Sequence, residues 1–179
     1  MRTSVDNLLI YDSELQFFAD RFTNQTGTNS AIHAVKCMAD LKAALNNYNA
    51  VKFLEIALHG KPGRLFLSNK TEIVGSYINT LATNQQFLQK NARILFDSCR
   101  IGADKTGDNF MDSIGAGLLL GKGGIVGATT VDNASYPFFP WVTGAHMVSG
   151  GLLKVRKYDE SGRLVASTAV AGNGISSHM

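Results

Sequence analysis

Short apolar runs alternate along this chain with segments in which apolar residues recur every three or four positions. Runs of the first kind are typical of strands covered on both faces, and segments of the second kind are typical of amphipathic helices. This alternation predicts an α/β fold with a mostly parallel central sheet and helices on both of its faces. The expected strands cover residues 7–12, 31–35, 51–58, 93–99 and 123–128. The expected helices between them carry Leu15, Phe18 and Phe22, then Met38, Leu41 and Leu45, then Ile78, Leu81 and Leu88, and finally Phe110, Met111, Ile114 and Leu118.

Turn and cap chemistry adds detail to this pattern. Ser13 to Gln16 has the spacing of a capping box, which predicts that the first helix begins there. Residues 64–67 and 73–74 are expected to form a small hairpin around the tip at 68–70. At the other end of the chain, residues 152–158 and 163–170 are joined by a polar turn and predict a C-terminal β-hairpin.

Composition limits the class of protein. A length of 179 residues with 45% hydrophobic content suits one domain over residues 1–179. The net charge of +3 arises from scattered residues, with one tight basic cluster at Lys154, Arg156 and Lys157, so no nucleic-acid partner is expected. Two cysteines do not make a disulfide scaffold. The chain shows neither a signal peptide nor a membrane span, and we expect no membrane partner.

Two of the predicted strands end on side chains that can do chemistry. Residues 54–60 end in His59-Gly60, and residues 93–99 end in Asp97-Ser98-Cys99. Parallel strands bring such ends to one edge of a sheet, where open α/β folds build active sites. A cysteine nucleophile needs a base and donors for the oxyanion that forms during attack. We therefore expect Cys99 as nucleophile, His59 as general acid/base, and the backbone amides of Gly60 and Cys99 as oxyanion donors.

A structural interpretation stands beside this one. A cysteine on an apolar strand is commonly a small buried hydrophobe, and a histidine at a strand end is commonly an ordinary hydrogen-bonded residue. The two residues occur together at the ends of two strands, which favours the catalytic interpretation.

These blocks resemble the signature of the caspase-like clan of cysteine peptidases, in which one apolar run ends in His-Gly and a second in Asp/Glu/Gln-Ala/Ser-Cys. Residues 59–65 and 95–103, with Gly107 and residues 114–129, look most like the bacterial caspase-like domain found near the N-termini of large surface adhesins. The likeness covers roughly residues 7–131. It implies a caspase-like three-layer sandwich and hydrolysis of peptide bonds in a peptide or protein substrate by His59 and Cys99. The alternative is a catalytically silent module for binding or assembly in a bacterial surface or effector system, either cytoplasmic or exported with a larger system.

Residues 123–153 contain no lysine or arginine and one acid, Asp132. In the caspase-like fold the loop after the strand that follows the nucleophile, here the expected strand 123–128, helps to shape the substrate pocket. The resemblance therefore implies that Tyr136, Phe138 and Trp141 form a recognition wall. Asp132 is the one carboxylate of this segment available to select a basic residue before the scissile bond. The aromatic residues are equally compatible with a hydrophobic cover over the sheet.

Two sets of residues suggest metal ions. Asp104, Asp108 and Asp112 are spaced four apart, which could hold calcium, although acids at a helix start also complement the helix dipole. His33 and Cys37 have a zinc-like spacing but no second pair completes a set, so Cys37 is predicted to be structural. We expect no metal and no cofactor.

The remaining histidines are His146 and His178, and one further fold class shares the predicted order of elements. His146 is a candidate polar lining residue, and His178 is expected to be exposed. A flavodoxin-like nucleotide or receiver domain shares the predicted order of elements, and the acids of residues 12–14 are the feature in its favour.

Overall fold

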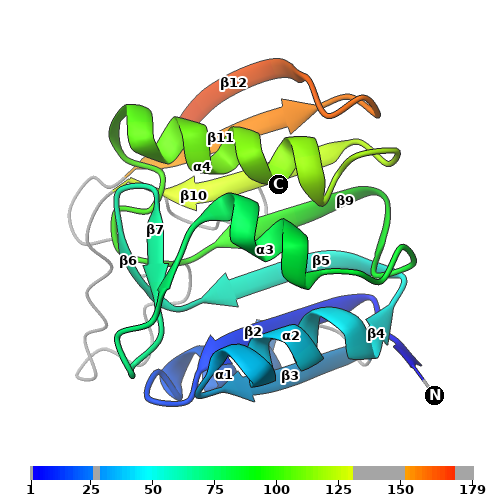
Figure 1. The fold of residues 1–179 in the computed structure, drawn as a ribbon, viewed down its shortest axis with the longest axis vertical. Helices are drawn as coiled ribbons and strands as arrows, with labels where there is room; N and C mark the ends of the chain where they lie inside the picture. The colour runs from blue at the N-terminus through cyan, green and yellow to red at the C-terminus, as the bar shows by residue number, and fades with distance from the viewer. Residues whose placement is uncertain (1, 26–28, 131–151, 172–179) are drawn as a thin grey trace.

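The computed structural model describes residues 2–25, 29–130 and 152–171, and its main feature is a seven-stranded sheet (Figure 1). The strand order is β12-β11-β10-β9-β5-β2-β3. The five strands from β10 to β3 run parallel, and β11 and β12 add an antiparallel hairpin. The elements of the chain are β1 Thr3–Ser4, β2 Asn7–Asp12, α1 Phe17–Gln25, β3 Ser30–Val35, α2 Met38–Asn47, β4 Tyr48–Asn49, β5 Val51–Ala57, β6 His59–Lys61, β7 Arg64–Phe66, β8 Glu72–Ile73, α3 Gly75–Leu81, β9 Leu88–Phe96, α4 Asp104–Gly117, β10 Gly124–Thr129, β11 Leu152–Tyr158 and β12 Leu164–Ala171.

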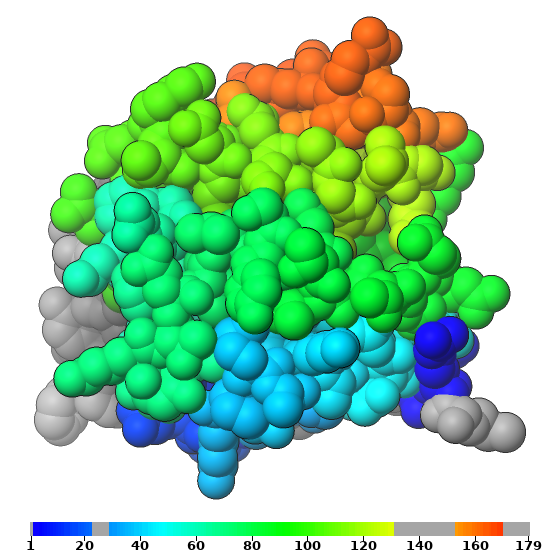
Figure 2. Space-filling view, in the orientation of Figure 1, coloured from blue at the N-terminus to red at the C-terminus, as the bar shows by residue number. Residues whose placement is uncertain are grey.

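Helices cover both faces of the sheet, so the α/β prediction is confirmed. On one face, α2, α3 and α4 pack on alternate residues of the strands, among them Ile10, Ile56 and Phe96. On the other face, Phe18 and Phe22 of α1 pack on residues of the opposite parity in β2, β5 and β9. Figures 1 and 2 show α2, α3 and α4 side by side on the near face, with the β11–β12 hairpin at the top. Among the helices of the described ranges, none has the length and apolar character needed to cross a membrane.

The order of strands and helices follows the hydrophobic pattern closely. The central strand β5 is buried at six of its seven positions, as its nearly continuous apolar sequence predicts. The small β6-β7-β8 sheet lies beyond the carboxyl end of β5, and it contains the predicted hairpin. Because β5 and β9 are parallel neighbours, their carboxyl ends emerge at the same edge.

Two local predictions were wrong. The third helix ends at Leu81, and Leu88 begins β9, where it pairs with Val51. Asn84 lies in the break between the two elements, where its side chain donates to the carbonyl oxygen of Tyr48 and accepts the Gln86 amide, a local bond that competes with helical hydrogen bonding.

The first helix likewise begins at Phe17 and not at the predicted capping box. The Asp12 carboxylate accepts the Glu14 amide at 3.0 Å, so the chain makes a turn there. A buried aspartate thus organises the segment that the capping pattern assigned to a helix start.

Candidate active site at the carboxyl edge of β5 and β9

His59 and Cys99 follow two adjacent strands and are brought to one corner of the molecule. His59 opens β6 directly after β5, and Cys99 lies three residues beyond the end of β9. The Leu58 amide, one residue before His59, donates to Ser98 Oγ at 3.2 Å. The two sequence blocks are therefore hydrogen-bonded to each other at the residues that immediately precede the histidine and the cysteine.

Gly60 and Cys99 are in direct backbone contact. A Cβ built on Gly60 would lie 2.5 Å from the carbonyl oxygen of Cys99 and 2.9 Å from its amide nitrogen. Only a residue without a side chain fits this approach. The two amides predicted as oxyanion donors therefore belong to neighbouring backbone segments, and the thiol of Cys99 is half-buried while His59 is exposed.

The loop that carries Cys99 is held from two sides. From β10, the Thr129 hydroxyl donates to the Ser98 carbonyl, and the Gly102 amide donates back to the Thr129 carbonyl at 2.8 Å. From the turn after β6, the Gly63 amide donates to the Ile101 carbonyl at 3.0 Å. Arg100, next to Cys99, has a φ of 52°, a left-handed conformation that costs a residue with a side chain about 1–2 kcal/mol. Such strain persists where surrounding contacts over-determine the backbone, as they do here.

Two acids flank His59, and neither was predicted to belong to the site. Asp12 ends β2 and is fully buried, and Glu14 is exposed in the following turn. One ligand atom from each acid and one ring nitrogen of His59 all lie within 4.8 Å of one another. The signal available in the sequence was that Asp12 ends a buried strand. We expected these acids only as support for a receiver-like fold, and they lie beside His59 instead.

A buried ionic network includes Asp97, two residues before Cys99 in the chain. Arg21 of α1 donates from Nη1 to Asp97 Oδ2 at 2.8 Å, and its Nη2 pairs with the Glu55 carboxylate of β5. The three side chains are only 9%, 1% and 6% exposed, in the order Arg21, Asp97 and Glu55. Burial raises the pKa of Glu55 to about 7 against the opposing charge of Arg21. The sequence signal for this network was an acid, Glu55, inside an otherwise apolar strand.

Comparison with known families adds one result. A family model described as a domain of unknown function, DUF4347, matches residues 13–119, more than half of the chain. The chain belongs to the DUF4347 family. No curated protein matches the chain. The DUF4347 match contains both His59 and Cys99 and ends just before β10.

Asp132 and the aromatic residues were predicted as substrate contacts of this DUF4347 domain. Asp132, Tyr136, Phe138 and Trp141 lie outside the described residues, as do His146 and His178.

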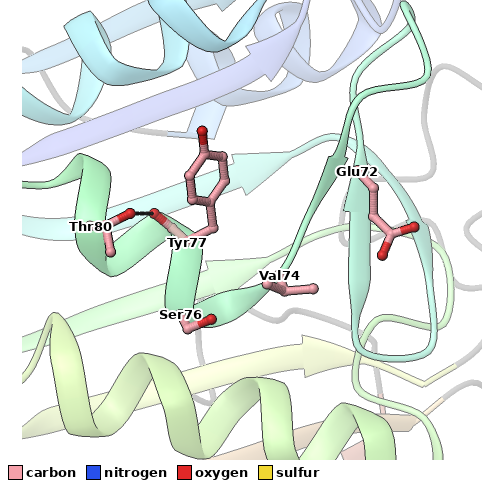
Figure 3. A pocket seen from close by; sticks show the side chains of 5 residues that line it. All are labelled: Glu72, Val74, Ser76, Tyr77 and Thr80. Carbon is pink, nitrogen blue, oxygen red and sulfur yellow. Dashed lines mark hydrogen bonds between the residues drawn. The ribbon is translucent and has the colours of Figure 1, made fainter.

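Two shallow recesses lie instead beside α3. One, of about 360 Å³, is lined by Glu72, Val74, Ser76, Tyr77 and Thr80 (Figure 3). The second, of about 280 Å³, shares Val74 and Ser76 with the first and reaches the turn after β6 at residues 62–64. Neither recess, as the described residues line it, includes His59 or Cys99.

The structure pairs two of the three α4 acids, Asp108 and Asp112, with cations and not with one another. Asp108 accepts from Lys154 at 2.7 Å, and Asp112 pairs with Arg156 at 2.9 Å and accepts from the Tyr158 hydroxyl. Lys154 and Arg156 of the basic cluster therefore neutralise Asp108 and Asp112. Although partial burial opposes it, the cations Lys154 and Arg156 hold the pKa of Asp108 below its usual range.

His33 and Cys37, the pair with zinc-like spacing, lie outside any candidate metal cluster among the described residues. His33 lies 3.4 Å from the Tyr48 hydroxyl through Nδ1, and its ring meets the tyrosine edge-on. Burial lowers the pKa of His33. Among the described residues, neither His33 nor Cys37 belongs to a group of three or more possible metal ligands. Cys37 lies directly before α2 as its N-cap residue, without a side-chain capping hydrogen bond, and its structural role stays a prediction.

Proposed function

We propose that this domain is a caspase-like cysteine peptidase in which Cys99 is the nucleophile and His59 the general acid/base. The observation that carries the proposal is the contact of the two blocks: Gly60 packs on the Cys99 backbone, and Leu58 is bonded to Ser98. The parallel sheet with helices on both faces is compatible with a caspase-like sandwich. The resemblance of both blocks to that clan supplies the reaction class.

The chemistry follows from the two side chains. His59 takes the proton of the Cys99 thiol, and the thiolate attacks the carbonyl carbon of the peptide bond. The negative charge that develops on the carbonyl oxygen is stabilised by the Gly60 and Cys99 amides. The imidazolium then protonates the leaving amine, and a thioester remains on Cys99. Water, deprotonated by the same imidazole, attacks the thioester, the carbon–sulfur bond breaks, and the acid is released. The imidazolium then returns its proton to the Cys99 thiolate, which restores the thiol.

The rigid setting of the Cys99 loop supports this mechanism. Backbone donors stabilise an oxyanion best when they do not have to reorganise during the reaction. The bonds from Thr129 and Gly63 hold residues 98–102 in one arrangement. We extend the proposal to substrate selection by Asp132 and by the aromatic residues Tyr136, Phe138 and Trp141.

The decisive experiment compares two thiols in one chain. Cys37 and Cys99 are both half-buried, so a simple difference in exposure does not favour either. A neutral haloacetamide at neutral pH should modify Cys99 at least about ten times faster than Cys37, because a thiolate stabilised by histidine is the reactive form. The rates are followed for each cysteine by peptide mass spectrometry.

His59→Ala is the test variant, and His33→Ala is the matched control. The first should remove the preference for Cys99, and the second should leave it intact. Equal labelling of both cysteines in the wild-type chain would refute the dyad. Turnover is then measured with a library of peptides that differ at the residue before the cleaved bond.

A binding or assembly module is the second candidate. Such a module could use exposed apolar side chains as contacts, and Tyr77 is 45% and Val165 55% exposed. Tyr77 projects from α3 and lines the recess of Figure 3, and Val165 lies on the edge strand β12. A selectively reactive Cys99 without cleavage of any library peptide would favour this candidate.

A further inference from the structure

Two acids that the dyad mechanism does not use, Asp12 and Glu14, form a cluster with His59. The three residues come from the end of β2, the turn after it and the start of β6. Their possible ligand atoms lie within 4.8 Å of one another. A tetrahedral ion with bonds of about 2.0–2.2 Å needs ligand atoms closer than this. Glu14 and His59 are exposed and have room to close on an ion, whereas Asp12 is fixed.

Asp12 has the features of an anchoring ligand. Its residue is fully buried, and backbone amides hold both of its carboxylate oxygens, Glu14 on Oδ1 at 3.0 Å and Ser68 on Oδ2 at 2.7 Å. The Ser68 bond comes from the segment after β7, so it also ties the hairpin that carries His59 to the end of β2. Each oxygen keeps a second lone pair. Hydrogen bonds of this kind orient carboxylates that bind metal ions.

The donor set selects a class of ion. One imidazole nitrogen with two carboxylate oxygens suits zinc and related transition ions, whereas calcium and magnesium prefer oxygen ligands alone. Three protein ligands leave a fourth position open for water.

We propose that Asp12, Glu14 and His59 bind a zinc-like divalent ion and that the bound ion switches off the peptidase. The inhibition rests on the proposed function of His59, but the binding does not. Coordination occupies the lone pair of the neutral imidazole, and the other ring nitrogen then carries the proton. Neither nitrogen can accept the thiol proton of Cys99, so release of the ion restores the base.

Binding is tested on the full chain after treatment with a chelator. Titration calorimetry with Zn²⁺, and visible absorption with Co²⁺, should report one ion per chain, while Ca²⁺ and Mg²⁺ should not compete. Glu14→Gln should weaken binding by at least about tenfold, since even outer partners of metal ligands contribute about 10–100-fold. Glu160→Gln, at an exposed glutamate paired with Lys90, is the matched control and should not alter binding.

A second variant separates this site from metal capture by the dyad. Cys99→Ser should retain the ion, and the Co²⁺ complex of the wild-type chain should lack the intense thiolate charge-transfer band. Loss of binding in Cys99→Ser, or unchanged binding in Glu14→Gln, would overturn the site.

The regulatory part is read from the alkylation rate of Cys99. Zinc should slow it in the wild-type chain by at least about tenfold, and Glu14→Gln should remain reactive at the same zinc concentration. If zinc binds through Glu14 but Cys99 is no more reactive than Cys37 without it, the proposed function fails and the site stands. If Cys99 is selectively reactive but binding ignores Glu14, the site fails and the proposed function stands. Peptide hydrolysis that needs zinc and survives Cys99→Ser would overturn both.

Discussion

Two arginines in this fold each pair with two carboxylates, but the two ionic networks differ in how far they are exposed to water. Arg21 bridges Glu55 and Asp97 near the Cys99 loop, and Arg156 bridges Asp108 and Asp112 between β11 and α4. The arginine side chains are 9% and 10% exposed, and within the described residues neither Nε has a hydrogen-bond partner.

The carboxylates make the difference between the two networks. Glu55 and Asp97 are 6% and 1% exposed, whereas Asp108 and Asp112 are 26% and 43% exposed. Water can therefore replace a lost partner at α4 but not near Cys99. The cost of breaking an ion pair depends on the charge that is left behind.

The largest expected effect is that of Arg21→Met. It leaves two buried carboxylates without a cation, so the free energy of unfolding should fall by about 3–5 kcal/mol. Arg156→Met is the matched control and should cost only about 1–2 kcal/mol, because water solvates its acids. Urea unfolding followed by circular dichroism measures both. Equal losses would show that the burial of the carboxylates does not set the cost.

Gly60→Ala tests whether the corner near Cys99 depends on packing as well as on charge. The added Cβ would meet the Cys99 backbone at 2.5 Å, and we expect a loss of stability of about 2–3 kcal/mol. The alkylation rate of Cys99 should fall as well, since the backbone must shift. At Gly121 a Cβ meets nothing within 4 Å and only its φ of 75° opposes alanine, so Gly121→Ala should leave the alkylation rate unchanged.

The pH dependence of stability should also differ between the networks. Folding raises the pKa of Glu55 from 4.5 to about 7, so between these values the folded state binds more protons than the unfolded state. The contribution of Glu55 is fully present below pH 4.5 and is lost as pH rises through 7.

Glu55→Gln removes this titration. Relative to the wild type, the variant should gain about 2.5 kcal/mol of stability between pH 5 and pH 8, because each unit of pKa shift is worth about 1.36 kcal/mol and most of the shift from 4.5 to about 7 falls in this range. Urea unfolding at both pH values measures the difference, with Glu160→Gln as the surface control. A constant difference between wild type and Glu55→Gln would contradict the assignment.

The smallest loss of stability is expected for a change at Asp112 of α4, whose side chain is 43% exposed. Asp112→Asn should cost about 0.5–1 kcal/mol, because Asp108 still faces Arg156 and the asparagine oxygen still accepts from Tyr158. Asp97→Asn, the same change at a buried acid, should cost clearly more. Reversal of this order in thermal or urea unfolding would overturn the comparison.

Local patterns in the sequence determined most of the architecture. The apolar runs of β2, β3, β5, β9 and β10 and the helical spacing in α2 and α4 each depend on residues close together in the chain. The same reasoning failed at Leu88 and at the Ser13 capping box, where Asn84 and Asp12 make contacts that no local pattern contains.

The candidate site divides in the same way. The sequence by itself determined that His59 and Cys99 each follow an apolar block, because the end of a buried strand shows in the change from apolar to polar residues. That the two strands are neighbours in the sheet was decided by the tertiary structure. Only the tertiary structure decided that Asp12 and Glu14 lie beside His59, and that Arg21 meets Glu55 and Asp97. These contacts join residues 34 to 76 positions apart in the case of Arg21, and they exist because packing of α1 against β5 and β9 excludes water and leaves each buried charge in need of a partner.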